Sequence, residues 1–200
     1  MDFSLLLTLL AGAYFLRRHE QRGRIRLLGQ HLGRYDIERR MEALTTGYHR
    51  ALGEPDPQRQ AQIWQLMGPD ERSLAEQFSR FATDFARVPQ EQARVSRLPL
   101  PIPYACALLP QLTFDMRRAL MLHAQGIAQA VGNDHVGSPR ERAFTLLAEI
   151  LLMQHSCHWF CRSRAVASAR LIRRHQTQHA QALAAVSPQT RAAYLALTGG

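Results

Sequence analysis

Residues 70–85 read D-E-R-S-L-A-E-Q-F-S-R-F-A-T-D-F, and their apolar side chains recur at steps of three and four. Leu74, Phe78, Phe81 and Phe85 therefore lie along one face of a predicted α-helix, with charged and polar residues on the other. No part of the sequence shows the alternation, bounded by turn residues, that is typical of a β-hairpin. The pattern predicts an all-α fold.

Two further helices are predicted before this stretch. Gly53 and Pro55 close the first of them, and the pair Asp56-Pro57 caps a short second helix that Gly68 ends. The first helix buries one apolar face, made of Ile37, Met41, Leu44, Tyr48 and Leu52.

Residues 97–103, R-L-P-L-P-I-P, cannot continue a helix because their prolines lack backbone N–H groups. We expect an extended connector here, between a first helical half at 34–96 and a second at 104–200. The second half begins with a helix that starts at Pro110 or Thr113. Its apolar face carries Phe114, Met116, Leu120, His123 and Ile127.

A capping box, S-P-R-E at residues 138–141, starts the next helix. No helix-breaking residue follows until about residue 185, so one long C-terminal helix is predicted, and Ser187-Pro188 starts a last short one. The expected architecture is a compact domain of about five to seven helices behind an N-terminal anchor.

The anchor is predicted from residues 3–16, F-S-L-L-L-T-L-L-A-G-A-Y-F-L, which carry no charge. A helix over residues 1–16 measures about 24 Å against a hydrocarbon core of about 30 Å, so snorkelling arginines or local thinning would have to complete a span. The residues predicted to contact lipid are Phe3, Leu5, Leu6, Leu7, Leu9, Leu10, Phe15 and Leu16.

Three other interpretations of this segment stay open. A cleaved signal peptide would use Ala11-Gly12-Ala13 as its small-residue site, although the segment lacks a basic start. A helix lying in the membrane plane would need a polar face, which residues 3–16 lack. A helix of this length can also be buried in the core of its own protein.

The charges that follow the anchor predict its orientation. Residues 17–33 form a basic juxtamembrane segment, whereas Asp2 is the only charged side chain before the apolar run. The positive-inside rule therefore places the body in the cytoplasm, as a single-pass protein of a bacterial-type inner membrane. Three cysteines, an odd number in a chain too long to need disulfides, agree with a reducing compartment.

All 25 basic residues are arginines, and their distribution is uneven. Residues 1–26 hold five Arg and two acids, residues 27–138 twelve of each, and residues 139–200 eight Arg and two acids. Two basic ends suit an anionic membrane surface, although a nucleic-acid groove would use the same charges. The arginines predicted to contact headgroups or a partner are Arg17, Arg18, Arg22, Arg24, Arg26, Arg162, Arg164, Arg170, Arg173 and Arg174.

One cluster could bind a metal. His155, Cys157, His158 and Cys161 follow one another at helical spacings, and their nitrogen and sulfur atoms suit zinc or haem iron. A further ligand would have to come from another helix, with His123, Cys106 and His135 as candidates. The spacing matches neither a C-x-x-C pair nor the C-x-x-C-H of covalent haem attachment. Cysteines buried in the core are therefore the favoured interpretation, ahead of a metal site and of a redox-active thiol.

The sequence contains no nucleophile elbow, zincin motif or phosphate-binding glycine loop, and residues 139–200 offer only Glu141 and Glu149 to orient a catalytic histidine. The leading hypothesis is a non-enzymatic, membrane-tethered scaffold or accessory protein without a cofactor. It would bind membrane lipids and a membrane-associated protein partner. The alternatives are a zinc- or haem-binding protein and, less favoured, a nucleic-acid-binding protein.

Overall fold

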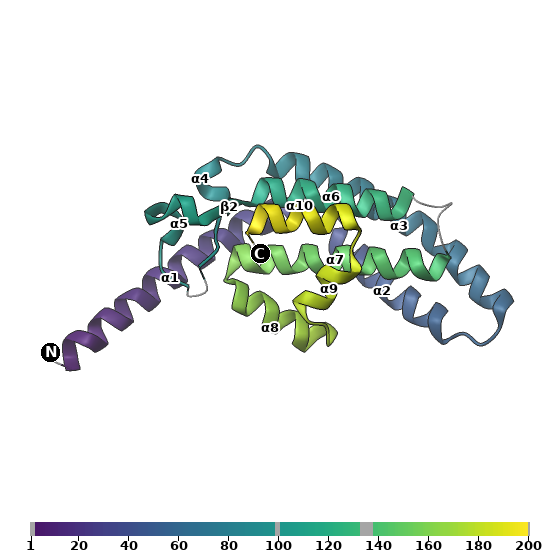
Figure 1. Cartoon of the computed structure of the whole chain (residues 1–200), viewed down its shortest axis with the longest axis horizontal. Coiled ribbons are helices and arrows are strands. Elements are labelled where there is room, and N and C mark those ends of the chain that lie inside the picture. Colours follow the sequence, from purple (N-terminus) through teal and green to yellow (C-terminus); the bar gives the residue numbers. More distant parts are fainter. Residues whose placement is uncertain (1–2, 99–100, 133–137, 200) are drawn as a thin grey trace.

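The computed structural model describes residues 3–98, 101–132 and 138–199, and helices dominate all three ranges (Figure 1). The all-α prediction is confirmed. The expected five to seven helices were too few, because the described residues form ten. In chain order the elements are α1 Phe3–Leu32, α2 Ile37–Gly53, α3 Pro57–Phe85, α4 Gln90–Ala93, β1 Arg94–Ser96, α5 Ala105–Leu108, the 3₁₀ turn η1 Pro110–Leu112, β2 Thr113–Asp115, α6 Met116–Gly132, α7 Pro139–Cys161, α8 Arg164–His175, α9 His179–Ala185 and α10 Pro188–Thr198.

Helix α3 runs through the point where the sequence predicted a break at Gly68. Pro69 lies inside the helix, where its missing N–H removes one backbone hydrogen bond. Packing of α3 along α2 compensates for this loss, since Trp64 and Leu74, on either side of the proline, are both buried in the core. Arg40 of α2 also forms an ion pair with Asp70 at 2.7 Å, directly after the proline.

The proline-containing connector does not separate two cores. Strands β1 and β2 flank it as an antiparallel pair, with Val95 opposite Phe114. Such three-residue strands are too short to show a periodic pattern in the sequence. The indole N–H of Trp159 in α7 donates to the Ser96 carbonyl at 2.9 Å, which fixes the strand pair to the second half of the chain.

The predicted long C-terminal helix was wrong, because the chain turns twice between residues 139 and 185. Helix α7 ends at Cys161, and the Ser163 hydroxyl then caps α8 by accepting from the Val166 N–H at 3.3 Å. Folding back in this way buries Ala167 and Leu171 of α8. A second turn at Gln176, which has a left-handed φ of 51°, leads into α9.

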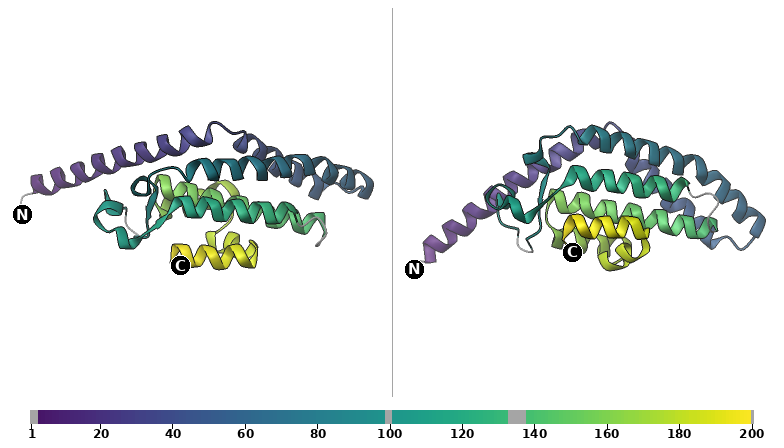
Figure 2. Two further views of the ribbon diagram at one scale, coloured as in Figure 1. Left: turned by 90° about the horizontal axis from the view of Figure 1, so that it is seen from above. Right: turned by 45° about the horizontal axis from the view of Figure 1, so that its top comes forward.

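One large apolar cluster unites both halves of the chain. It contains residues of α1, α2, α3, α6, α7 and α8. The four apolar residues of α3 that predicted the helix, Leu74, Phe78, Phe81 and Phe85, are fully buried within it. Helices α3, α6 and α7 run side by side, and α10 covers α6 and part of α7 (Figures 1 and 2). A smaller cluster under α9 and α10 contains Ala148, Leu152, Val186 and Tyr194.

Gly126 lets α10 approach α6 closely. A Cβ at this position would lie 2.4 Å from Glu149 Oε2 and 2.6 Å from Thr190 Oγ1. Burial raises the pKa of the Glu149 carboxyl, whose Oε1 accepts from the Ser187 N–H at 3.2 Å. A side chain at residue 126 would therefore displace a buried polar contact that seats α10.

We expect Gly126→Ala to lower the free energy of unfolding by about 1–3 kcal/mol, because the added methyl overpacks this contact. Urea denaturation would measure the change. Gly132→Ala in the same helix is the matched control, since its added Cβ meets no described atom within 4 Å beyond its own helix backbone and chain neighbours. The control should be neutral or stabilising by up to about 1 kcal/mol, and equal effects at both positions would contradict the prediction.

Candidate functional site

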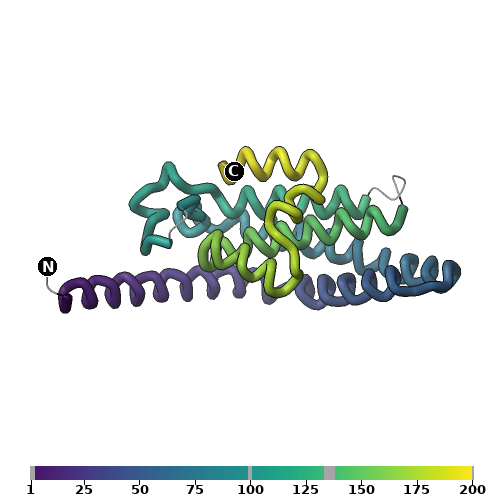
Figure 3. Tube along the Cα trace, turned by 60° about the horizontal axis from the view of Figure 1, so that its bottom comes forward, coloured from purple at the N-terminus to yellow at the C-terminus, as the bar shows by residue number. Residues whose placement is uncertain are grey.

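The first half of α1 projects from the body (Figure 2), and each of its residues from 3 to 16 is exposed. We call residues 3–16 the apolar arm; Figures 2 and 3 show it extending beyond the rest of the fold. Its large apolar side chains are between 45% and 75% exposed, from Leu6 to Phe3. All eight residues predicted to contact lipid lie on this arm and are exposed, which rules out the interpretation that the segment is buried in the core.

The arm is continuous with the basic segment. Residues 1–16 and 17–33 were predicted as an anchor and a separate basic segment, but one helix runs from Phe3 to Leu32. Residues 1 and 2, including Asp2, lie outside the described part of the chain. None of the described helices is both long enough and apolar enough to cross a bilayer. The predicted single-pass span is therefore not supported.

The structure divides the five arginines of α1 into two groups. Arg18, Arg22 and Arg26, each four residues apart, are exposed along one side of the helix, and we call them the basic stripe. Arg17 and Arg24 are half-buried and face the body. Of the arginines predicted to contact headgroups, Arg24 serves the fold instead.

Arg24 joins α1 to the rest of the molecule. Its Nη2 donates to Glu20 Oε1 at 2.9 Å and to Cys106 Sγ at 3.1 Å, and its Nη1 donates to the Phe160 carbonyl at 3.1 Å. The second oxygen of Glu20 accepts from the Tyr104 N–H at 2.9 Å. Both the charge of Arg24 and that of Glu20 are thereby satisfied within the protein.

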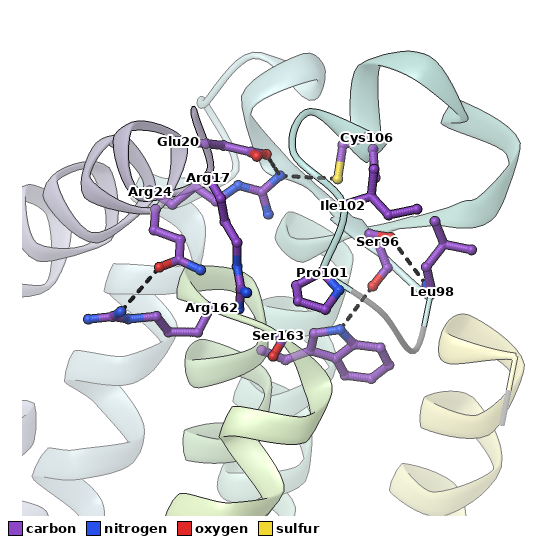
Figure 4. Close-up of a pocket in the computed structure, with 13 residues that line it drawn as sticks. Arg17, Glu20, Arg24, Ser96, Leu98, Pro101, Ile102, Cys106, Arg162 and Ser163 are labelled. Carbon is purple, nitrogen blue, oxygen red and sulfur yellow. Dashed lines mark hydrogen bonds and ion pairs between the residues drawn. The ribbon is translucent and has the colours of Figure 1, made fainter. Parts of the chain in front are cut away.

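A small cavity lies beside this junction, at the foot of the apolar arm (Figure 4). We call it the α1 cavity; its volume is about 40 Å³. Arg17 and Arg162 reach it from α1 and from the α7–α8 turn, opposite an apolar wall that includes Leu98 and Ile102. Ser163, the N-cap residue of α8, also lines the cavity and follows Arg162 in the chain.

The two free cations at the α1 cavity differ from Arg24. Arg17 and Arg162 form no ion pair with any acid in the described ranges, and the Arg162 guanidinium donates to the uncharged Gln21 amide oxygen at 3.1 Å. The Arg17 Nε is buried and has no hydrogen-bond partner among the described residues. A buried guanidinium N–H without an acceptor is unfavourable, so an acceptor beside Arg17 would be stabilising.

The arginines of α8 are all exposed. Arg164 lies over the Trp159 ring at 5.3 Å, and Arg170 contacts His158 Nδ1 at 3.2 Å. No acid of the described residues pairs with Arg164, Arg170, Arg173 or Arg174. Helix α8 therefore presents arginines that no described acid compensates, and their contact with an anionic partner stays a prediction.

The four metal-binding candidates do not all meet at one point. Cys157, His158 and Cys161 line a groove of about 1020 Å³ between α1, α2 and α8, where His158 Nδ1 contacts Arg170. His155 is instead buried on the side of α9, where its ring stacks on His179 at 4.1 Å and its Nε2 contacts Ser168 Oγ at 3.1 Å. The described residues contain no group of three or more His, Cys, Asp or Glu side chains placed to hold a metal ion. His135, one proposed extra ligand, lies outside them.

Neither cysteine of the groove is an activated thiol. Burial raises the pKa of Cys161 to about 11, and burial together with the nearby Cys161 raises that of Cys157 further. Thiolates are the reactive and metal-binding form, so both side chains behave as small apolar residues at neutral pH.

The sequence did not reveal a buried Ser–His pair. His123 Nε2 lies 2.8 Å from Ser156 Oγ, and both residues are fully buried between α6 and α7. Burial lowers the pKa of His123 to about 3. With no exposed surface on either side chain, the pair contributes to packing between the two helices.

Comparison with known proteins finds no matching family model, no similar curated protein and no similar solved structure.

Proposed function

We propose that this protein is a membrane-surface adaptor: the apolar arm enters one leaflet at the cytoplasmic face, and the helical body holds a membrane-associated protein partner there. The observation that carries the proposal is the exposure of the arm, whose fourteen residues leave the body as a solvent-exposed apolar helix. Burial of such side chains contributes about 1.5–3 kcal/mol for each large residue. A lipid phase provides that burial without any contact to the body.

The length of the arm fits one leaflet better than a complete span. Fourteen helical residues measure about 21 Å, which exceeds the roughly 15 Å of hydrocarbon in one leaflet and falls short of the roughly 30 Å in both. Arg18, Arg22 and Arg26 follow at the level expected for headgroups. Each arginine near an anionic surface contributes about 1 kcal/mol. Arginines on this side of the arm also favour the cytoplasmic face.

Leu7→Arg tests the role of the arm. A charge in the middle of the apolar segment opposes insertion by about 3 kcal/mol, so the vesicle partition coefficient should fall by about 100-fold. Flotation of the full-length protein with phosphatidylcholine vesicles containing phosphatidylglycerol would measure it. Because Leu7 is 51% exposed and is not part of the buried core, the unfolding midpoint of the body should not change.

Leu52→Arg is the matched control, because Leu52 is about as exposed as Leu7 but lies at the far end of α2. Its vesicle binding should equal that of the unmodified protein. If Leu7→Arg binds vesicles as well as this control does, the arm is not the membrane contact. If the unmodified protein forms dimers that Leu7→Arg abolishes, and does not float with vesicles, the arm associates with a second copy instead.

A further inference from the structure

We infer that the α1 cavity binds a single phosphate group, and that the headgroup of an anionic lipid supplies it. The inference depends on the proposed function for the source of the phosphate, whereas the site itself depends only on the residues around the cavity. Figure 4 shows the residues that line this cavity.

The charge around the cavity is that of an anion site. Arg24 is neutralised by Glu20, whose two oxygens are both occupied, so Arg17 and Arg162 leave two positive charges uncompensated by described residues. Guanidinium groups bind phosphate oxygens through paired, charge-assisted hydrogen bonds. The Ser163 hydroxyl accepts from Val166 and donates to no described residue, so its proton is available to an anion.

The size of the cavity limits what can enter. Its volume of about 40 Å³ corresponds to only a few water molecules, which admits a compact tetrahedral group but neither a nucleotide base nor an acyl chain. Helix α8 begins directly after Ser163, so the positive end of its backbone dipole lies beside the cavity and adds to the attraction of an anion. The pocket therefore suits a phosphate group that is presented at the end of a larger molecule.

The position of the cavity points to lipid as that molecule. Arg17 directly follows Leu16, the last residue of the apolar arm, so the cavity opens where an inserted arm emerges from the hydrocarbon. Phosphates of the same leaflet lie at that depth. Insertion of the arm and capture of a headgroup phosphate would then be two parts of one membrane contact.

The test compares two double variants of the full-length protein that remove the same charge. Arg17→Gln with Arg162→Gln empties the cavity of its free cations, whereas Arg18→Gln with Arg22→Gln changes two exposed members of the basic stripe. Vesicles of phosphatidylcholine with phosphatidic acid are compared with vesicles of phosphatidylcholine with oleate at equal surface charge. Inorganic phosphate binding is measured separately by calorimetry, with chloride at matched ionic strength.

On phosphatidic acid vesicles the cavity variant should lose about tenfold more affinity than the stripe variant, because hydrogen-bonded charges contribute more than exposed ones. On oleate vesicles the two variants should weaken equally. Inorganic phosphate should bind to the stripe variant and not to the cavity variant. Far-UV circular dichroism and urea unfolding of both variants establish that the body is folded.

Equal losses on both vesicle types, together with unchanged phosphate binding, would overturn the site, since only net charge would then matter. Loss of phosphate binding in the cavity variant alone, with equal vesicle affinities, would overturn lipid as the source and leave a site for free phosphate. If the unmodified protein binds phosphate but no vesicle, the proposed membrane function fails while the phosphate site stands.

Discussion

Replacing Glu71 with alanine is expected to lower the free energy of unfolding by about 3–5 kcal/mol, a large part of the total stability of an ordinary domain. The Glu71 carboxylate is almost completely buried and joins three helices. Its Oε1 accepts from the Tyr48 hydroxyl of α2 at 2.6 Å, and its Oε2 lies 3.4 Å from Arg142 Nε of α7. Alanine would remove the carboxylate that accepts from the buried Tyr48 phenol and that pairs with the half-buried Arg142 guanidinium.

Urea denaturation followed by circular dichroism would measure this effect. Glu76→Ala is the matched control, because it removes an exposed carboxylate from the same helix and should change stability by less than about 0.5 kcal/mol. Glu71→Gln should fall between the two, since it keeps an acceptor for Tyr48 but removes the charge beside Arg142. A Glu71→Ala protein as stable as the control would show that this network does not hold α2, α3 and α7 together.

Acidification is expected to produce the second large effect, a loss of about 4 kcal/mol of stability between pH 7 and pH 5. Burial lowers the pKa of both His123 and His155 to about 3 in the folded protein. In the unfolded chain the same rings have a pKa near 6.5. Between these values the unfolded chain binds more protons, so stability must fall as the pH falls. The full contribution is present above about pH 6.5 and is progressively lost toward pH 3.

Urea midpoints measured at a series of pH values would give this slope. His155→Asn removes one of the two buried imidazoles and should reduce the slope below pH 6 by about 1.4 kcal/mol per pH unit. His49→Gln, which changes an exposed histidine, should leave the slope as it is. Stability that stays constant from pH 7 to pH 5 would contradict the burial of these rings.

The structure also shows why some helix boundaries could be predicted and others could not. The capping box at Ser138 and the start at Ser187 are confirmed, because these signals use side chains within one turn of the boundary. The turn at Ser163 carries no glycine or proline, and the continuous helix through Pro69 contradicts its local signal. The turn at Ser163 depends on the packing of α8 against α7, and the continuous helix at Pro69 depends on the packing of α3 against α2. A pattern of neighbouring residues does not reveal such contacts between helices.

The helical periodicity, the apolar stripe of α3 and the apolar character of residues 3–16 could all be predicted from the order of residues, because each is a property of neighbours along the chain. How single side chains are used depends on the packing of helices that are distant in sequence. Residues two apart on a helix point to nearly opposite sides. Because other helices pack against both of these sides of α7, His155 and Cys157 cannot bind the same metal ion. In the same way, docking of α1 turned Arg17 and Arg24 inward and left the basic stripe outside, because a helix can present only one side to the body it packs against.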